Sequence, residues 1–187
     1  GRDYAVWAVF ASEEFSVEPM TWCFPIAGCV PYRGYFSRHR AERFARDLKA
    51  GGLDVFSGGV PAYSTLGWGS DPVLNTVLMW SDDRLAGLIF HELAHQVVYV
   101  KNESAFNESF ATFVEEVGVQ QWLRDRGDTQ ALAAYQSSRV WRARVVKQIF
   151  NHRVSLVRLY RSGLSADVMR KKKELLFAHF RERYRNE

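Results

Sequence analysis

The sequence lacks most of the features that would place it outside the ordinary globular proteins. Its 187 residues contain only two cysteines and five prolines, which excludes a disulfide-rich scaffold and a proline-rich disordered chain. It has no internal repeat, no low-complexity tract and no apolar run near the about 18–20 residues of a membrane span. Gly1-Arg2-Asp3 opens no signal peptide. With 47% hydrophobic residues, we expect a soluble chain of about one domain with a real core.

Charge is distributed unevenly along the chain. The net charge is +4, yet residues 139–187 alone carry 14 of the 25 lysines and arginines against four acidic residues. Nucleic-acid binding would need a recognisable motif or a basic stripe with aromatic stacking positions, and neither is present, so no nucleic-acid partner is expected. Contact with anionic lipid head groups is a second option. A solvated polar face is the favoured interpretation of these basic residues.

The order of the predicted elements indicates an α+β fold. Strand patterns gather before residue 70 and helical patterns follow it. We expect one domain over 1–187: a small N-terminal sheet with helices (1–80), two helices (81–127) that carry the motifs described below, and a long antiparallel helical hairpin (128–187). The predicted strands are 4–10, 53–56 and an edge strand over 62–68, with strand and loop over 20–36. The predicted helices are 38–50 with Ser37 as N-cap, 71–79, 82–100, 105–126, 129–162 and 166–184.

Residues 91–95 read His-Glu-Leu-Ala-His and fall inside the predicted helix over 82–100. Because residues four apart on a helix share a face, His91 and His95 can bind one metal ion. Glu92 then projects beside the position of an attacking water, where a carboxylate is a natural general base. Two solvated histidines on a helix are the alternative, so the motif needs support from elsewhere in the chain.

That support comes from a carboxylate at the start of the next helix. Asn107-Glu108-Ser109-Phe110-Ala111 opens the predicted helix over 105–126, and a turn before it can bring Glu108 back toward the histidines as a third ligand. Two imidazoles and one carboxylate suit zinc better than a harder metal. With one open coordination position, zinc lowers the pKa of a water to about 7 and polarises a carbonyl.

Further residues complete the predicted site. Thr112 and Glu115 share the face of Glu108, and either can orient a ligand histidine; a solvated position is an equal alternative for Glu115 and the expected one for Glu116. The segment 62–68 can pair with an extended peptide by β-augmentation, although an ordinary core strand is the alternative. The residues predicted to bind substrate in this way are Tyr63, Ser64, Thr65, Leu66 and Gly67.

These motifs resemble known families. Residues 91–96 and 107–115 together resemble the core of the gluzincin metallopeptidases. A longer series of blocks, in the same order, resembles the bacterial putative aminopeptidase family, whose members are often predicted to be lipoproteins. The blocks are Trp22-Cys23-Phe24-Pro25, Gly28-Cys29-Val30, Tyr32-Arg33-Gly34-Tyr35-Phe36, Ala62-Tyr63-Ser64-Thr65-Leu66-Gly67-Trp68, Asp71-Pro72-Val73-Leu74-Asn75-Thr76, Ile89 to Gln96 and Phe106 to Ala111.

The resemblance implies a chemistry. Zinc would be bound by His91, His95 and Glu108, with Glu92 as base, in an enzyme that hydrolyses peptides as an aminopeptidase. Gluzincins also imply a tyrosine or histidine after the third ligand that stabilises the developing negative charge. Tyr160 is the predicted residue, with His152 and Tyr135 as alternatives.

The resemblance also implies a location. Family members look like lipoproteins of the bacterial envelope, periplasmic or attached to the outer membrane. The lipidated N-terminus is absent from this chain, which is expected to be a fragment of a longer one. Spacing alone lets Cys23 and Cys29 form a small disulfide or remain buried thiols. Export favours the disulfide.

Two departures from the alanyl aminopeptidases limit the inference. Only twelve residues separate His95 from Glu108, fewer than in those enzymes, and the Gly-x-Met-Glu-Asn segment that recognises a free amine has no counterpart. Metal-dependent hydrolysis therefore transfers more directly than aminopeptidase specificity. The rival hypothesis is a binding or scaffold module of the envelope with a structural metal and the basic hairpin as its working surface. Glu92 argues against it, because a structural site does not need that carboxylate.

Overall fold

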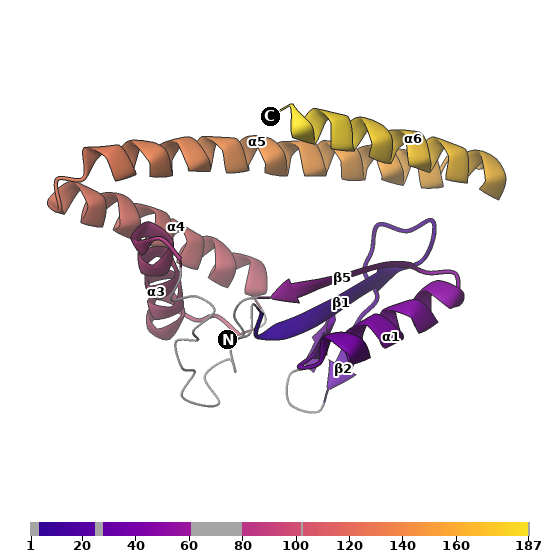
Figure 1. The fold of residues 1–187 in the computed structure, drawn as a ribbon, viewed down its shortest axis with the longest axis horizontal. Helices are drawn as coiled ribbons and strands as arrows, with labels where there is room; N and C mark the ends of the chain where they lie inside the picture. Colours follow the sequence, from indigo (N-terminus) through magenta and orange to yellow (C-terminus); the bar gives the residue numbers. More distant parts are fainter. Residues whose placement is uncertain (1–3, 25–27, 61–79, 102, 187) are drawn as a thin grey trace. The chain divides into compact units, whose positions relative to one another are not determined.

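The computed structural model describes residues 4–24, 28–60, 80–101 and 103–186 (Figure 1). The α+β fold predicted from the sequence is confirmed. The contacts divide the chain into two compact units. The sheet unit comprises residues 1–76 and 145–187, and the helix unit comprises residues 77–144. Each is described by itself below.

The sheet unit is built on a small antiparallel sheet with strand order β4-β1-β5. Its central strand pairs along its whole length with β5, from Val6 opposite Val60 to Ser12 opposite Asp54. A separate two-stranded hairpin pairs Cys23 with Cys29, and the two sulfurs form a disulfide. The strands are β1 (Val6–Ser12), β2 (Trp22–Phe24), β3 (Gly28–Val30), β4 (Arg33–Tyr35) and β5 (Asp54–Val60).

Helix α1 (Arg38–Ala50) covers one face of this sheet (Figure 1). Its N-terminus is capped by Ser37, whose Oγ accepts a hydrogen bond from the Arg40 N–H. The capping residue and both bounds agree with the sequence prediction. Val9 of β1 and Ala41 of the helix are fully buried at the centre of this contact, with aromatic and aliphatic side chains packed around them.

The C-terminal hairpin also agrees with the prediction. Helix α5 (Thr129–Tyr160) is followed by a turn at Gly163, with φ of +70°, and by α6 (Ala166–Arg185), which returns along the end of α5 (Figure 1). Ile149 is 51% exposed, whereas Leu156 and Leu159 are the buried residues of α5.

Charged side chains attach this hairpin to β5 and to the segment between β1 and β2. Arg170 binds both carboxylate oxygens of Glu14, and Lys173 pairs with Asp54 and donates to the Glu14 carbonyl at 2.6 Å. Arg153 of α5 pairs with Glu18 at 2.5 Å. The sequence predicted a solvated face for these basic residues: Arg153 and Arg170 are exposed as predicted although they form ion pairs, whereas the prediction is wrong for Lys173, whose side chain is 13% exposed. Sequence pattern does not indicate partners that lie more than 100 positions away.

The helix unit contains α3 (Asp82–Val97), α4 (Ser104–Asp125) and the first part of α5. Helix α3 ends three residues before the predicted end, because Val98 is extended and the β-branched residues that follow favour that backbone. Glu116 is not a solvated residue as predicted, since it forms an ion pair with Arg139 of α5. None of the described helices combines the length and hydropathy needed to cross a membrane.

Two sequence predictions lie outside the described residues. These are the edge strand over 62–68, with the substrate-binding residues assigned to it, and the short helix over 71–79.

Candidate metal centre

His91 and His95 lie one turn apart on α3 and direct their rings toward the same point. Their Nε2 atoms are 3.2 Å apart, and the ring planes are nearly perpendicular, at 81°. Both side chains are about one-fifth exposed, at 19% and 22%. The helical spacing thus places two nitrogen donors side by side at a surface that a small ion can reach.

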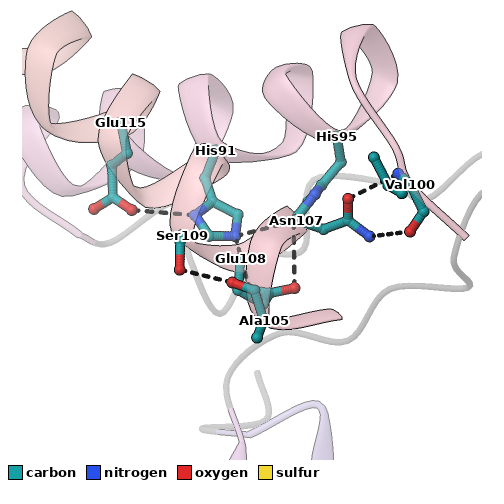
Figure 2. Close-up of polar contacts among 8 residues, drawn as sticks. All are labelled: His91, His95, Val100, Ala105, Asn107, Glu108, Ser109 and Glu115. Carbon is teal, nitrogen blue, oxygen red and sulfur yellow. Dashed lines mark hydrogen bonds and ion pairs between the residues drawn. The ribbon is translucent and has the colours of Figure 1, made fainter. Parts of the chain in front are cut away.

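Glu108 completes a three-residue cluster from the start of α4. Its Oε2 lies 3.4 Å from His91 Nε2 and its Oε1 lies 3.5 Å from His95 Nε2. Figure 2 shows the carboxylate facing both rings from the neighbouring helix. The turn predicted to fold Glu108 back toward the histidines therefore does so in the structure.

The separations of these donor atoms fit a tetrahedral ion. Ligand atoms at about 2.0–2.1 Å from a tetrahedral zinc ion lie about 3.3–3.4 Å from one another. The two Nε2 atoms are 3.2 Å apart, and the nearest Glu108 oxygen lies 3.4 Å from one of them and 3.5 Å, through the other oxygen, from the second. Two imidazole nitrogens with one carboxylate are also a donor set that zinc accepts. The residues present therefore fit the predicted metal.

Glu115 contacts His91 at Nδ1, the ring nitrogen that does not face the other ligands. Its Oε2 lies 3.3 Å from His91 Nδ1, so this nitrogen donates to the carboxylate (Figure 2). A neutral imidazole that carries its proton on Nδ1 leaves the Nε2 lone pair free for a metal. His95 Nδ1, by contrast, is buried without a hydrogen-bond partner among the described residues. Of the two predicted supporting residues, Glu115 reaches a ligand, whereas Thr112 is exposed and contacts no described polar group.

Two glycines allow α3 and α4 to approach closely enough for these contacts. A Cβ on Gly87 would lie 3.2 Å from Glu115 Oε1, and a Cβ on Gly118 would lie 2.8 Å from the Phe90 ring. Glycine in a helix interior costs about 1 kcal/mol relative to alanine. The close helix contact gives both positions a packing reason to be glycine.

The remaining predicted residues differ in where the structure places them. Glu92 is exposed on α3 and forms no ion pair or hydrogen bond with a described residue. Tyr160 belongs to the sheet unit, where its ring meets Phe15 at 5.7 Å. Burial, with the charges of Asp54 and Glu14, raises the pKa of Tyr160 to about 12. Its phenol is thus protonated at neutral pH, the form that can donate a hydrogen bond, and its catalytic role stays a prediction.

The two alternatives to Tyr160 are also placed. Burial, followed by the charge of Glu115, raises the pKa of Tyr135 in the helix unit. His152 lies in the sheet unit between the rings of Phe177 and Phe180, with centroid distances of 4.8 and 4.9 Å. The structure gives His152 a packing role in the hairpin.

The sequence analysis missed Asn107 and the two helix-packing glycines. Asn107 is buried at the start of α4, one residue before Glu108. A buried asparagine is uncommon, and glycines inside strongly helical segments were the only visible signal for the close contact.

Comparison with protein families identifies the chain. A model described as putative aminopeptidase matches residues 1–187. The chain belongs to this family. The family predicted from the motif blocks is thereby confirmed, and its name makes this family member a candidate peptidase. Neither a curated protein nor a solved structure matches the chain.

Proposed function

We propose that this protein is a zinc-dependent metallopeptidase of the gluzincin type that acts as an aminopeptidase. The observation that carries the proposal is the convergence of His91, His95 and Glu108: the two Nε2 atoms are 3.2 Å apart, and each has an oxygen of the Glu108 carboxylate within 3.5 Å. The family name independently supports a peptidase.

The roles of the residues follow from their positions. His91, His95 and Glu108 hold the metal, and Glu115 fixes the ring orientation of His91. Zinc bound there supplies a Lewis acid that polarises a peptide carbonyl and makes a water more acidic. Glu92 accepts the proton of the attacking water and passes it to the leaving amine. Its exposure and lack of a described partner suit a group that must meet solvent and substrate.

The substrate class is a peptide or protein. The segment around Tyr63–Gly67 is proposed to pair with it, and Tyr160 is proposed to stabilise the negative charge that develops on the carbonyl oxygen. Release of an N-terminal amino acid is proposed on the family name alone. No described residue is assigned to the substrate's free amine.

The proposed location is the bacterial cell envelope, with a lipidated N-terminus in the full-length form. The disulfide between Cys23 and Cys29 supports an oxidising compartment such as the periplasm. Fractionation of cells that express the full-length protein tests this, and recovery of the protein in the cytosolic fraction would contradict it.

The decisive test of function is Glu92→Gln. The amide keeps the size of the side chain but cannot accept a proton, so we expect peptide hydrolysis to fall by about 10²–10⁴-fold. Zinc content, measured by atomic emission, and the far-UV circular dichroism spectrum should not change. His91→Ala removes a ligand and should lower zinc content as well as activity.

Glu103→Gln is the matched control, because Glu103 is another exposed glutamate of the helix unit and its side chain forms no capping hydrogen bond. It should retain both activity and zinc. Equal peptide hydrolysis by the wild-type protein and Glu92→Gln would contradict the catalytic assignment. It would favour a structural metal site.

A further inference from the structure

Asn107 is the one polar residue of the described chain that is buried, with 2% of its surface exposed. Burial of an amide costs free energy unless its donor and acceptor are both satisfied. A buried asparagine at the first turn of a helix therefore needs a specific partner.

That partner is the main chain of a single residue. Asn107 Oδ1 accepts the N–H of Val100 at 2.8 Å, and Asn107 Nδ2 donates to the C=O of Val100 at 2.8 Å (Figure 2). One side chain thus satisfies both backbone groups of a residue that lies outside the helices. The pair of hydrogen bonds fixes both the position and the rotation of this peptide segment.

The two residues joined in this way lie between the metal ligands in the chain. Val100 follows His95 by five residues, and Asn107 directly precedes Glu108. Helix α3 ends at Val97, so the connection to α4 is not held by helical hydrogen bonds in between. The Glu103 N–H also donates to the Val100 carbonyl at 3.2 Å, and the two bonds of the Asn107 side chain add to this contact and hold the start of α4 against the residues that follow α3.

We propose that Asn107 is a positioning residue for the metal centre, which sets the Glu108 carboxylate against the two imidazoles. The inference rests on the proposed function, since it concerns the same three ligands. No other side chain of this size offers an acceptor and a neutral donor in one plane: leucine offers neither, and aspartate would set a carboxylate oxygen against the Val100 carbonyl. The identity of the side chain therefore matters, as well as its burial.

The test compares metal affinity in Asn107→Ala and Asn107→Asp with that of the wild-type chain. Zinc affinity is measured by competition with a chromophoric chelator, and the geometry is followed by the visible absorption of the Co²⁺-substituted protein. Loss of a group that orients a ligand typically costs about 10–100-fold in metal affinity. We expect both variants to lose affinity in this range and to show a weaker or shifted Co²⁺ spectrum. If Asn107→Ala does not fold, the comparison rests on Asn107→Asp, whose side chain has nearly the same size and shape as that of asparagine.

Ser109→Ala is the matched control. Ser109 Oγ also donates to a main-chain carbonyl, that of Ala105 at 2.6 Å, from the exposed face of the same helix start. Its removal should leave zinc affinity and the Co²⁺ spectrum unchanged. Circular dichroism and thermal unfolding without metal give the folded fraction of every variant.

The possible outcomes separate the two proposals. Asn107 variants that unfold at lower temperature but bind zinc as tightly as wild type would assign Asn107 a purely structural role and overturn this inference alone. A wild-type protein that binds no zinc would overturn the proposed function and, with it, the role of Asn107. Asn107 variants that fold but bind zinc more weakly, while Ser109→Ala binds zinc as tightly as the wild-type protein, would support both proposals.

Discussion

The two helical pairs of this protein are held together by opposite means. Helices α3 and α4 meet through short side chains and glycines, with Ala94, Ala111 and Val119 buried between or beside them. The hairpin of α5 and α6 relies on long side chains, and no residue of α6 is buried. The two helices meet through the ring of His152 against Phe177 and Phe180, and ion pairs attach α6 to Glu14, which follows β1, and to Asp54 of β5.

The difference teaches where geometric precision is needed. Short side chains in contact fix the distance between two helix backbones, because there is no flexible chain to adjust. Long charged side chains tolerate movement of the helix that carries them. The pair with short contacts is the one that carries His91, His95 and Glu108. The hairpin contributes no described residue to this cluster.

The strongest way to break this comparison is Gly118→Ala. The new Cβ would lie 2.8 Å from the Phe90 ring, so either that ring or the helix that carries it must shift. Overpacking of this kind costs about 1–3 kcal/mol, which exceeds the gain of about 1 kcal/mol in helix propensity. We expect lower stability in urea unfolding together with weaker zinc binding. A variant as stable as wild type would show that the contact of α3 with α4 is not tight.

A smaller effect is expected in the hairpin for Lys173→Met. The variant loses the ion pair with Asp54 and the hydrogen bond to the Glu14 carbonyl, but keeps the apolar stem. Because Asp54 is about half exposed, we expect a loss of only about 1 kcal/mol. The stability difference from wild type should shrink in high salt. Lys172→Met, at the exposed neighbouring position, is the control and should match wild type.

The smallest expected effect is the pH response of His152. Burial lowers the pKa of His152 from 6.5, so the unfolded chain binds its proton more readily than the folded chain. This group's contribution to stability is therefore present above the unfolded pKa and is lost as the pH falls toward the folded one. The variant His152→Leu should therefore lose less stability than the wild-type protein when the pH falls from about 7 to about 5. The exposed His179→Leu on α6 is the control, and an equal response in both variants would contradict the prediction.

Much of the fold follows from local signals in the sequence. Ser37 begins α1, and glycines with positive φ follow α1, α4 and α5 at Gly52, Gly127 and Gly163. These residues act on the backbone beside them, so their effect can be read without knowing the rest of the structure. The end of α3 was missed because the apolar pattern continues beyond Val97 while the backbone becomes extended.

The candidate site likewise contains residues that the sequence predicts and residues that it does not. The histidines and Glu108 were predictable because helical spacing and one short turn bring them together. Asn107 was not, because its partner is the main chain of Val100, which no sequence pattern identifies. The ion pair of Arg170 with Glu14 spans 156 positions, and charge alone does not specify which acid an arginine will meet.

The short connection between α3 and α4 bears on the order of folding. All three candidate ligands lie within eighteen positions of one another, from His91 to Glu108, whereas β1 pairs with β5 across about fifty residues. Closing a short loop costs less chain entropy, and local contacts form faster than distant ones. The ligands can therefore meet while the sheet is still open. A metal present at that stage would bind an immature chain and favour the pairing of α3 with α4 before the rest of the protein has folded.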